Sequence, residues 1–419
     1  MTGVGPDGPV VVVGGGLVGL SCAWFLRRAG AEVTVLEAAD RVGAGASRGN
    51  AGAICPSVAE PLPAPGMIRR ALGDLRRPEA ALYVAPRYAP RMTSFLARFT
   101  AAATAEAYAR GLAAMAGLAR SAFDAYDDLA AAGIGTHARR EGYLFAHRDA
   151  EAAAGERGLV LRMAELGVGR GPGPILDGSE LREREPLLSD AVVAGFELPG
   201  ERWIDPSRLV DDLEAGLRSA GVGIETGAPV RAIHDLDDEI ELETPAGRRH
   251  GARVVLAAGA WTRELCAGLG LRVPLLPGKG YSFALHPERL PGHALFLEDV
   301  HVVASPMDDR LRVAGTMEFD GTMDRFDRRR VEAIVRGLRT ALTGVDPADR
   351  TEEWVGPRPM TPDGLPLIGA VPRHPRIVVA SGHNMFGLTL APVTGRVVAG
   401  AIVDGDPGVD LAPFATDRF

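Results

Sequence analysis

Apolar and polar positions near the start of the chain predict a strand, a helix and a second strand. Val10 to Val13 is a β-branched apolar run of the kind found in buried parallel strands. A helix is expected from about Leu17 to Ala29, because Gly30 stands where helices commonly stop. Glu32 to Leu36 predicts the second strand, and the acidic residue Glu37 follows it directly.

The turn between the first strand and the helix has the spacing of a dinucleotide-binding loop. Its sequence, residues 14–19, is GGGLVG. Gly14 makes the tight turn, Gly16 lets the backbone approach a pyrophosphate, and Gly19 lets the helix pack closely on the strand. The helix N-terminus stabilises phosphate charge, and Glu37 can accept hydrogen bonds from a ribose diol. This unit predicts dinucleotide binding but does not separate NAD from FAD.

A second stretch of small residues, from Arg41 to Gly52, favours a large flat ligand. Its glycines and alanines let the backbone come close to such a ligand. Ser47 and Asn50 supply hydrogen bonds, and Arg41 can neutralise a phosphate. A plain surface loop is the alternative interpretation.

An alanine-rich segment from about Thr93 to Ala132 predicts helix with one apolar face. The apolar positions at helical spacing are Leu112, Met115, Leu118, Phe123, Tyr126 and Leu129. We expect this face to pack in the core. A peripheral membrane contact is the alternative, although the polar face lacks a dense basic stripe.

The rest of the chain predicts several strands and one well-marked helix. Asp205 is an expected N-cap with Pro206 at the first helical position, and this helix runs to about Ala220. The strands predicted before and after it are Gly142 to Ala146, Val192 to Leu198, Gly223 to Thr226, Ile240 to Glu243, Gly251 to Leu256 and Val378 to Ala380.

Composition and charge narrow the function classes. The chain has 46% hydrophobic and 24% charged residues, which is ordinary for a globular protein, and its net charge of −8 argues against nucleic-acid binding. Three widely spaced cysteines build neither a disulfide framework nor a zinc site, which fits a reducing cytoplasm. The uncharged run from Pro9 to Leu26 holds four glycines, so we interpret it as the phosphate loop and not as a membrane span.

Two basic residues stand out. Arg358 lies between two prolines in the segment GPRPMTPDGLPLIG (residues 356–369), which we expect to be rigid and turn-rich. A preorganised guanidinium can clamp a carboxylate with two parallel hydrogen bonds, and a structural salt bridge is the alternative. Lys279 is the only lysine among 46 basic residues, so either an ammonium is required there or one lysine was retained by chance.

These motifs resemble those of the FAD-dependent amino-acid oxidoreductases of the D-amino-acid oxidase superfamily, and the chain is most similar to bacterial D-amino-acid dehydrogenases. Residues 43–57, GAGASRGNAGAICPS, resemble the family's loop from the ribose to the flavin ring. The resemblance covers nearly the whole chain. It implies a two-domain α/β flavoprotein with a Rossmann-like FAD domain built on a parallel sheet (1–60, 200–262 and 352–419). Residues 61–199 and 263–351 would form an antiparallel-sheet substrate domain.

The resemblance also implies the site residues. Arg358 would bind the substrate carboxylate. Lys279 and Tyr281 would lie in a segment that runs beside the flavin ring, where a positive charge stabilises reduced flavin. His383 is either a flavin contact or a loop histidine, and Trp261 is also expected to belong to the core. The implied FAD contacts are Gly14, Gly16, Leu17, Val18, Gly19, Glu37, Ala38, Arg41, Ala46, Ser47, Asn50, Ala51, Gly52, Val230, Ala258, Gly259, Trp261, Gly387, Leu388 and Thr389.

Two features after residue 380 bear on the flavin pocket. A helix from about Ala391 to Ile402 is expected to point its N-terminus at the flavin. Asn384 stands where family members often carry a glycine, which leaves the pocket shape and the substrate open.

The implied activity is oxidative deamination of an amino acid, with a D-amino acid favoured. Hydride transfer from Cα to flavin N5 gives an imino acid, which hydrolyses to a 2-keto acid and ammonia. The alternatives are an oxidoreductase of secondary or N-methyl amino acids and a flavin-bearing subunit of a larger complex. We expect non-covalent FAD, because nothing near Cys55 activates its thiol, and no metal. The electron acceptor is oxygen or a quinone, and the expected location is the cytoplasm, with a peripheral contact to the inner membrane face left open.

Overall fold

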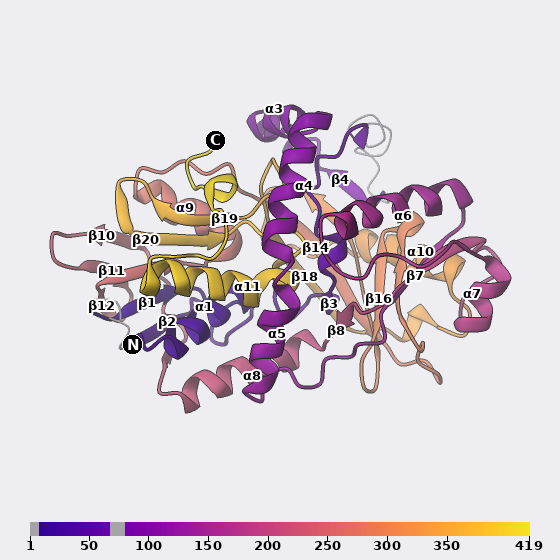
Figure 1. Ribbon diagram of the computed structural model, residues 1–419, viewed down its shortest axis with the longest axis horizontal. Helices are drawn as coiled ribbons and strands as arrows, with labels where there is room; N and C mark the ends of the chain where they lie inside the picture. The colour runs from indigo at the N-terminus through magenta and orange to yellow at the C-terminus, as the bar shows by residue number, and fades with distance from the viewer. Residues whose placement is uncertain (1–7, 68–79) are drawn as a thin grey trace.

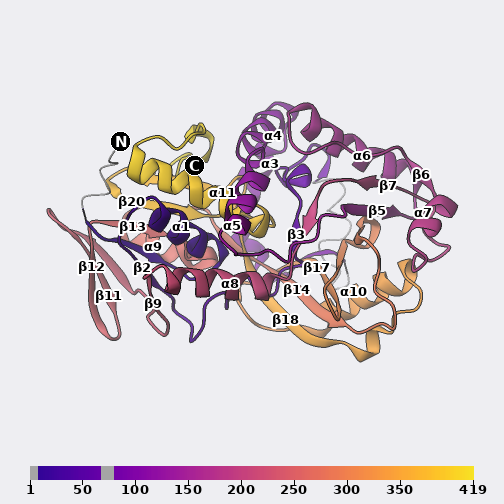
Figure 2. The same ribbon diagram turned by 60° about the horizontal axis from the view of Figure 1, so that its bottom comes forward.

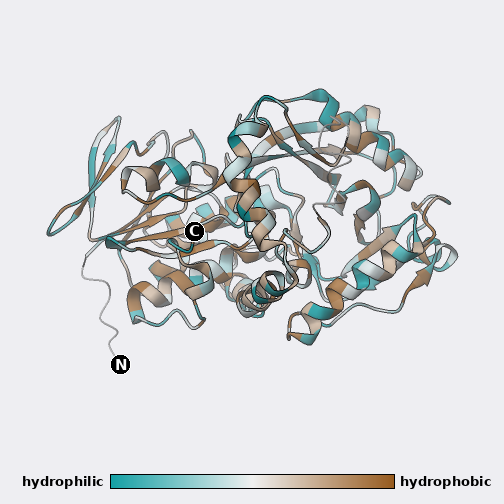
Figure 3. Cartoon of the chain, turned by 90° about the horizontal axis from the view of Figure 1, so that it is seen from above, coloured by the Kyte–Doolittle hydropathy of each residue, from teal (hydrophilic) through white to brown (hydrophobic). Residues whose placement is uncertain are grey.

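The structure of the protein is a computed structural model that describes residues 8–67 and 80–419 (Figure 1). Two sheets lie side by side along the long axis of the molecule, with helices packed around them (Figures 1 and 2). The strands inside the molecule are mostly hydrophobic, whereas hydrophilic residues are found mainly in the loops and on the outer sides of the helices (Figure 3).

The first sheet has six strands in the order β19-β20-β13-β1-β2-β9. All neighbours are parallel except β19, which is antiparallel to β20. The strands are β1 (Val10–Val13), β2 (Val33–Leu36), β9 (Gly223–Glu225), β13 (Arg253–Leu256), β19 (Leu367–Val371) and β20 (His374–Ser381). The predicted unit of β1, helix α1 (Leu17–Arg28) and β2 is confirmed.

Both faces of this parallel sheet are covered, which explains why its strands are apolar throughout. Val10 and Val12 pack into a core that holds helices α1 (Leu17–Arg28), α8 (Pro206–Ser219) and α11 (Gly387–Ala399). Val11 and Val13 face the opposite core. That core is formed with helix α9 (Thr262–Gly268) and a three-stranded antiparallel sheet of β10 (Ala232–Asp235), β11 (Ile240–Thr244) and β12 (Gly247–Gly251).

The second sheet has nine strands in the order β18-β14-β17-β16-β15-β5-β7-β6, with β4 paired to β17. It is antiparallel except for the β15–β5 and β17–β4 pairs. The strands are β4 (Leu82–Val84), β5 (Tyr143–His147), β6 (Leu176–Asp177), β7 (Ala194–Leu198), β14 (Leu276–Leu285), β15 (Ala294–Leu297), β16 (Val302–Pro306), β17 (Leu311–Phe319) and β18 (Thr351–Met360).

Smaller elements complete the fold. The helices α6 (Ala150–Glu165), α7 (Gly178–Arg184) and α10 (Arg328–Ala341) accompany the nine-stranded sheet, and β3 (Ala53–Ile54) pairs with β8 (Arg202–Trp203). Short 3-10 turns cover Pro56–Val58, Ala89–Met92, Gly259–Trp261, Glu298–Val300, Pro347–Asp349 and Ala412–Phe414, and a π turn covers Gly400–Asp404.

The segment predicted as one helix from Thr93 to Ala132 is divided into three: α3 (Thr93–Ala102), α4 (Ala105–Ala119) and α5 (Ala122–Ala131). Thr104 explains one break, because its hydroxyl caps α4 by accepting from the N–H of Ala107. The predicted apolar face is buried in the core around α1 and α11, which confirms its packing role. Phe123 is only half-buried.

Several other boundaries differ from prediction. Gly251 to Leu256 is not one strand, because Ala252 separates β12 from β13. Arg358 lies in the ten-residue strand β18 and not in a turn. Helix α11 begins at Gly387, earlier than the expected Ala391. Asp205 does cap α8, where it accepts from the N–H groups of Ser207 and Arg208.

The predicted domain division needs two corrections. Most of β18 falls in the segment assigned to the FAD domain, yet the strand pairs with β14 in the nine-stranded sheet. Helices α4 and α5 fall in the segment assigned to the substrate domain, yet they pack with α11 beside the parallel sheet.

Among the described residues, one helical run is long and apolar enough for a membrane span, Gly387–Asp404, and 67% of it is buried inside the fold.

Candidate active site

One large cavity lies between the two sheets. Its volume is about 1830 Å³, and residues of both sheets line it. Single-ligand pockets usually measure roughly 300–1,000 Å³. The cavity therefore has room for a large cofactor and a second, smaller molecule.

The glycine loop forms one end of this cavity and needs its glycines for close packing. A Cβ on Gly14 would lie 2.5 Å from the carbonyl oxygen of Ala257. A Cβ on Gly19 would lie 1.9 Å from the carbonyl oxygen of Gly14. Gly16 borders the cavity at the start of α1, where no side chain of the helix caps its N-terminus. Ser47 instead accepts from the N–H of Leu17 at 3.0 Å. This open helix end fits a pyrophosphate.

Glu37 stands at the end of β2 on the cavity wall. Its carboxylate accepts from the N–H of Gly15 at 2.7 Å and from that of Ala39 at 2.8 Å. Each carboxylate oxygen has further lone pairs, so the group can also bind a ribose diol. Glu37 therefore both braces the glycine loop and presents the acceptor that a dinucleotide needs.

Most of the predicted cofactor contacts meet in this cavity. Those that line it are Gly14, Gly16, Leu17, Val18, Glu37, Ala38, Ala46, Ser47, Asn50, Ala51, Val230, Ala258, Gly259, Trp261, Gly387, Leu388 and Thr389. Their placement fits FAD, with a dinucleotide cradle at the parallel sheet and α11 beginning at the wall.

Four expectations about this set are corrected. Gly19 lies behind the loop, and Gly52, at φ +86°, supports a tight turn against Ile204. Arg41 is exposed and does not border the cavity. Trp261 is 45% exposed, so it is a rim residue and not part of the core.

Arg358 reaches the cavity from β18. Its guanidinium donates to the carbonyl oxygen of Thr316 at 2.8 Å and touches the sulfur of Met317. No carboxylate pairs with it among the described residues, which argues against the structural salt bridge. Burial lowers the pKa of Arg358 to about 10, because water is largely replaced by protein around it. Its remaining N–H groups are available to an anion in the cavity.

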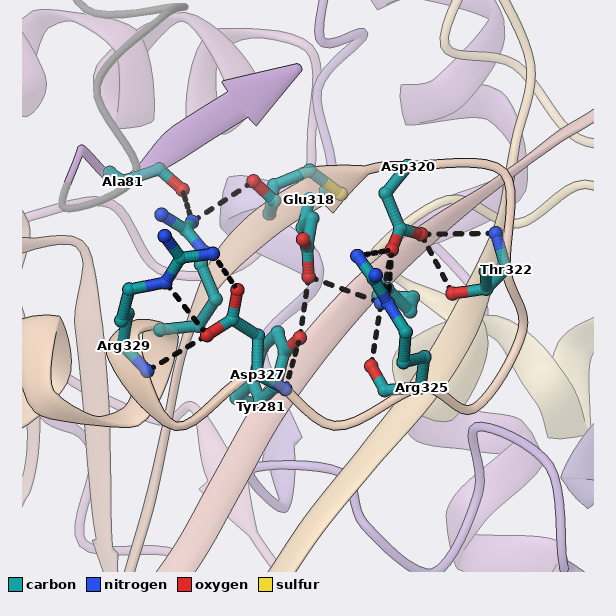
Figure 4. Close-up of polar contacts among 11 residues, drawn as sticks. Ala81, Tyr281, Glu318, Asp320, Thr322, Arg325, Asp327 and Arg329 are labelled. Atoms are coloured by element: carbon teal, nitrogen blue, oxygen red, sulfur yellow. Dashed lines mark hydrogen bonds and ion pairs between the residues drawn. The ribbon is translucent and has the colours of Figure 1, made fainter. Parts of the chain in front are cut away.

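Lys279 is turned away from this cavity, which corrects its expected place beside the flavin. The side chain is fully buried, and its ammonium lies 3.2 Å from Glu318 and 3.1 Å from Asp320. Figure 4 labels these two carboxylates and draws their polar contacts. Its neighbour Tyr281 does border the cavity, but the phenol hydroxyl donates outward to Glu318 at 2.5 Å. Burial and this carboxylate raise the pKa of Tyr281, so the phenol stays protonated.

His383 borders the cavity and is also hydrogen-bonded within the fold. Its Nε2 lies 2.9 Å from the hydroxyl of Thr394 on α11. Both open interpretations are therefore compatible with its position. The adjacent Asn384 has φ +53°, a left-handed conformation in which glycine and then asparagine are preferred. Asn384 is therefore compatible with this backbone conformation, and its amide forms hydrogen bonds with Thr361.

The buried imidazole of His383 predicts an acid-sensitive step in stability. Burial lowers its pKa from 6.5 to about 4. The unfolded chain therefore binds more protons than the folded protein between about pH 4 and pH 6.5, and stability falls as the pH drops through this window. We expect His383→Gln to reduce the fall in the free energy of unfolding across this pH window, by about 3 kcal/mol at most. Tm measured from pH 4 to pH 8 tests this, and an unchanged slope would assign the step to another group.

Sequence reasoning missed two residues that shape the wall. Trp354 lies so close to Gly49 and Gly356 that a Cβ on either glycine would come 2.0 Å from the indole. Thr316, which holds Arg358, has φ +57°. Gly49 was part of the predicted small-residue loop, but nothing in the sequence indicated its partner. A β-branched residue gives no signal of a left-handed backbone.

A cysteine and a cluster of possible metal ligands also bear on the predictions: Cys55, and His234 with Glu241 and Glu243. Cys55 borders the cavity, and its thiol hydrogen-bonds to the buried carboxyl group of Glu201. His234, Glu241 and Glu243 bring possible metal-ligand atoms within 4.8 Å of one another on β10 and β11. His234 forms a hydrogen bond with Glu243, and Glu241 forms an ion pair with Arg248, so the members of this cluster also have partners within the fold.

Known proteins resemble this chain over nearly its whole length. Residues 9–401 match the family model of FAD-dependent oxidoreductases known as DAO. The chain is 33% identical over 421 residues to the D-amino acid dehydrogenase of Methylobacterium radiotolerans, covering 98% of this chain and 99% of that protein. It is 30% identical over 418 residues to the D-amino acid dehydrogenase of Rhizorhabdus wittichii, covering 98% of this chain and 100% of that protein.

Solved structures show the same fold. Glycine oxidase from Geobacillus kaustophilus superposes with a TM-score of 0.71 at 23% identity, covering 98% of this chain and 99% of the other. L-proline dehydrogenase from P. horikoshii superposes with a TM-score of 0.72 at 20% identity, covering 99% of this chain and 98% of the other. The predicted α/β flavoprotein fold and the predicted FAD cofactor are confirmed, and the chain belongs to the DAO family of FAD-dependent oxidoreductases.

Proposed function

We propose that this protein is a D-amino-acid dehydrogenase that oxidises the Cα–N bond of its substrate. The observation that supports it most is the Arg358 guanidinium, which borders the cavity beyond the FAD cradle and has no acidic partner among the described side chains. A planar cation held in this way suits a carboxylate. The D configuration is supported by the names of the relatives that are about one-third identical.

The residues around Arg358 also suggest which side chains the substrate carries. Met317 touches the guanidinium, and it packs with Met92, Phe95 and Phe319, all of which border the cavity. An apolar substrate side chain can be buried against these residues, which stabilises it by about 25 cal/mol per Å² of surface removed from water. We therefore propose amino acids with apolar side chains as the preferred substrates.

In this proposal the chain binds and orients, and FAD, when bound, accepts the two electrons released from the substrate. Arg358 fixes the carboxylate, and the apolar wall fixes the side chain. Two anchors on one carbon leave its hydrogen and amino group in defined directions, and this orientation is the main contribution of the protein. FAD is held without a covalent bond.

The electron acceptor and the location extend the proposal. We infer an acceptor other than oxygen, since the relatives with 30% or more identity are named dehydrogenases. Leu96, Trp261 and Met385 are large, exposed and apolar, and each borders the cavity. They support a contact with a lipid-soluble quinone or with the inner face of the membrane. The three cysteines are buried thiols, which suits the cytoplasm.

A substrate panel with two readouts tests the proposal. Purified holoenzyme is given D- and L-methionine, D-phenylalanine, D-glutamate, L-proline and sarcosine, with dye reduction and peroxide release measured in parallel. We expect D-methionine and D-phenylalanine to be oxidised with kcat/KM at least about tenfold above D-glutamate, since burying a charged side chain is costly. Dye reduction without peroxide is expected. Oxidation of L-proline or sarcosine alone would assign the protein to the secondary-amine alternative.

A further inference from the structure

The buried cluster around Lys279 lies directly behind the cavity wall. Three oxygen atoms converge on the Lys279 ammonium: Glu318 at 3.2 Å, Asp320 at 3.1 Å and the carbonyl of Arg325 at 2.7 Å (Figure 4). The ammonium donates hydrogen bonds to Asp320 and to the Arg325 carbonyl, and it forms an ion pair with Glu318. A planar guanidinium has five donors in a fixed fork, so it does not match this site. The cluster accounts for one lysine in a chain that otherwise uses arginine.

The charges of this cluster are balanced. Arg325 binds the same oxygen of Asp320 that Lys279 binds, and Thr322 donates to the other oxygen. Burial acts to raise the pKa of Asp320, but the hydrogen bonds from Thr322 and Lys279 outweigh it, and the pKa is lowered. Glu318 is fully buried, and one of its oxygens has no hydrogen-bond partner among the described residues. Glu318 therefore depends on the contacts to its other oxygen.

Those contacts join two strands at an irregular point of the sheet. The oxygen of Glu318 that meets Lys279 also accepts from the Tyr281 hydroxyl, so it holds the residues on both sides of Gly280. In the β14–β17 ladder Lys279 pairs with Glu318, but Tyr281 pairs with Gly315. Two residues of β17, Thr316 and Met317, thus stand opposite Gly280 alone. This is a β-bulge, and such bulges re-aim the groups next to them.

The bulge is what holds Arg358. The carbonyl that accepts from the Arg358 guanidinium belongs to Thr316, whose φ is +57°. A β-branched residue adopts this conformation only where its surroundings impose it. Gly280 lies against the same guanidinium, because a Cβ there would come 2.2 Å from its central carbon. Backbone positions at Thr316 and Gly280 therefore set where the guanidinium lies.

We propose that Lys279, Tyr281 and Glu318 act as a positioning lock that fixes the bulge and thereby the orientation of Arg358. This inference rests on the proposed function, in which Arg358 binds the substrate carboxylate. The three residues act through Arg358 and not on the reacting atoms. The lock removes the need for an acidic partner, which would compete with the substrate for the guanidinium.

Ligand binding to the oxidised holoenzyme tests the lock without turnover. Butyrate and its uncharged amide, butyramide, are titrated while the visible absorption of bound FAD is recorded. Lys279→Met/Glu318→Gln removes one charge of each sign and leaves Asp320 paired with Arg325. We expect the Kd for butyrate to rise about tenfold, with the Kd for butyramide changed less than about twofold. FAD content should match that of the unaltered protein.

A double-mutant cycle and a control variant make the result specific. Once Arg358→Met is present, the two lock substitutions should not weaken butyrate binding further, because coupled residues are not additive. Arg202→Met/Asp127→Asn removes a different ion pair, with contacts of 2.7 and 3.0 Å on β8 and α5, and should leave both Kd values unchanged. Additive effects in the cycle would overturn the lock.

Failure of the lock and failure of the proposed function give different results. Unchanged butyrate affinity in the double variant, with a large loss in Arg358→Met, would refute the lock alone. Unchanged affinity in Arg358→Met would refute the carboxylate-binding role itself. If the double variant does not retain FAD, the Tyr281→Phe variant tests the lock in its place. It removes only the hydroxyl that meets Glu318, so a butyrate Kd raised about threefold supports the lock and an unchanged Kd refutes it.

Discussion

Replacing Arg358 with methionine is expected to lower kcat/KM for an apolar D-amino acid roughly 30- to 5,000-fold. This corresponds to a loss of about 2–5 kcal/mol in transition-state stabilisation. The reason is that the substrate carboxylate would lose the guanidinium that we propose binds it, and it would have to be buried without that partner. FAD content should stay normal, because the glycine loop and Glu37 lie on other elements. Steady-state kinetics with a flavin-to-protein ratio for each preparation measures both quantities.

The same variant should be at least as stable as the unaltered protein. Arg358 has one carbonyl partner and no carboxylate in the described structure, and burial lowers its pKa, so its charge is held at a cost in free energy. A methionine of similar length avoids that cost. A structural salt bridge would give the opposite result, because breaking a buried pair is destabilising. A fall in Tm together with the loss of activity would therefore contradict the clamp.

Two comparisons sharpen this prediction. Arg358→Lys should also be impaired, since a point charge on a flexible stem does not reproduce two parallel hydrogen bonds. The amide of the same amino acid should lose much less than the acid in Arg358→Met, because an uncharged group gains little from a guanidinium. Equal losses for both compounds would leave the carboxylate without an assigned partner.

The sequence predicted the dinucleotide cradle well because every part of it is local. The strand, glycine loop, helix and Glu37 follow one another within thirty residues, so spacing alone carries the geometry. The two glycines that the motif assigns to close packing, Gly14 and Gly19, are the ones where an added Cβ would collide with backbone. The spacing of the glycines therefore reflects the steric limits of close backbone packing, and the structure confirms those limits.

The other side of the cavity was predicted less completely because its contacts are distant in sequence. Arg358 was identified from its own context, but Thr316, which holds it, lies 42 residues earlier on another strand. Lys279 was correctly marked as unusual and wrongly placed, since its partners at 318 and 320 become neighbours only through strand pairing. Composition can flag such a residue but does not say toward which side of a strand it points.

Exposure was also difficult to predict. Trp261 follows a buried strand and has the largest side chain, so a core position was a reasonable expectation, yet it stands at the cavity rim. The helical segment after Thr93 has one continuous apolar face, but Thr104 divides it by offering a cap to the following helix. In both cases the deciding interaction is with the backbone or with the ligand cavity, which hydrophobic periodicity does not report.

Glu37→Ala is expected to weaken FAD binding more than any other single change in the cradle that leaves the glycines intact. The carboxylate would be lost both as the acceptor for the ribose diol and as the acceptor for the N–H groups of Gly15 and Ala39. Hydrogen bonds to a charged group contribute about 1.5–3 kcal/mol, so the Kd for FAD should rise roughly 10- to 150-fold. Reconstitution of the apoprotein with FAD, followed by flavin fluorescence, measures this Kd.

Two further variants separate these roles of Glu37. Glu37→Gln keeps the shape and one acceptor oxygen but removes the charge, so its Kd for FAD should lie between those of the unaltered protein and Glu37→Ala. Glu32→Ala removes an exposed carboxylate just before the same strand and should leave FAD binding unchanged, because Glu32 does not border the cavity. Equal weakening in Glu32→Ala would point to a general charge effect. Normal FAD affinity in Glu37→Ala would mean that the loop holds its shape, and the cofactor its ribose, without this carboxylate.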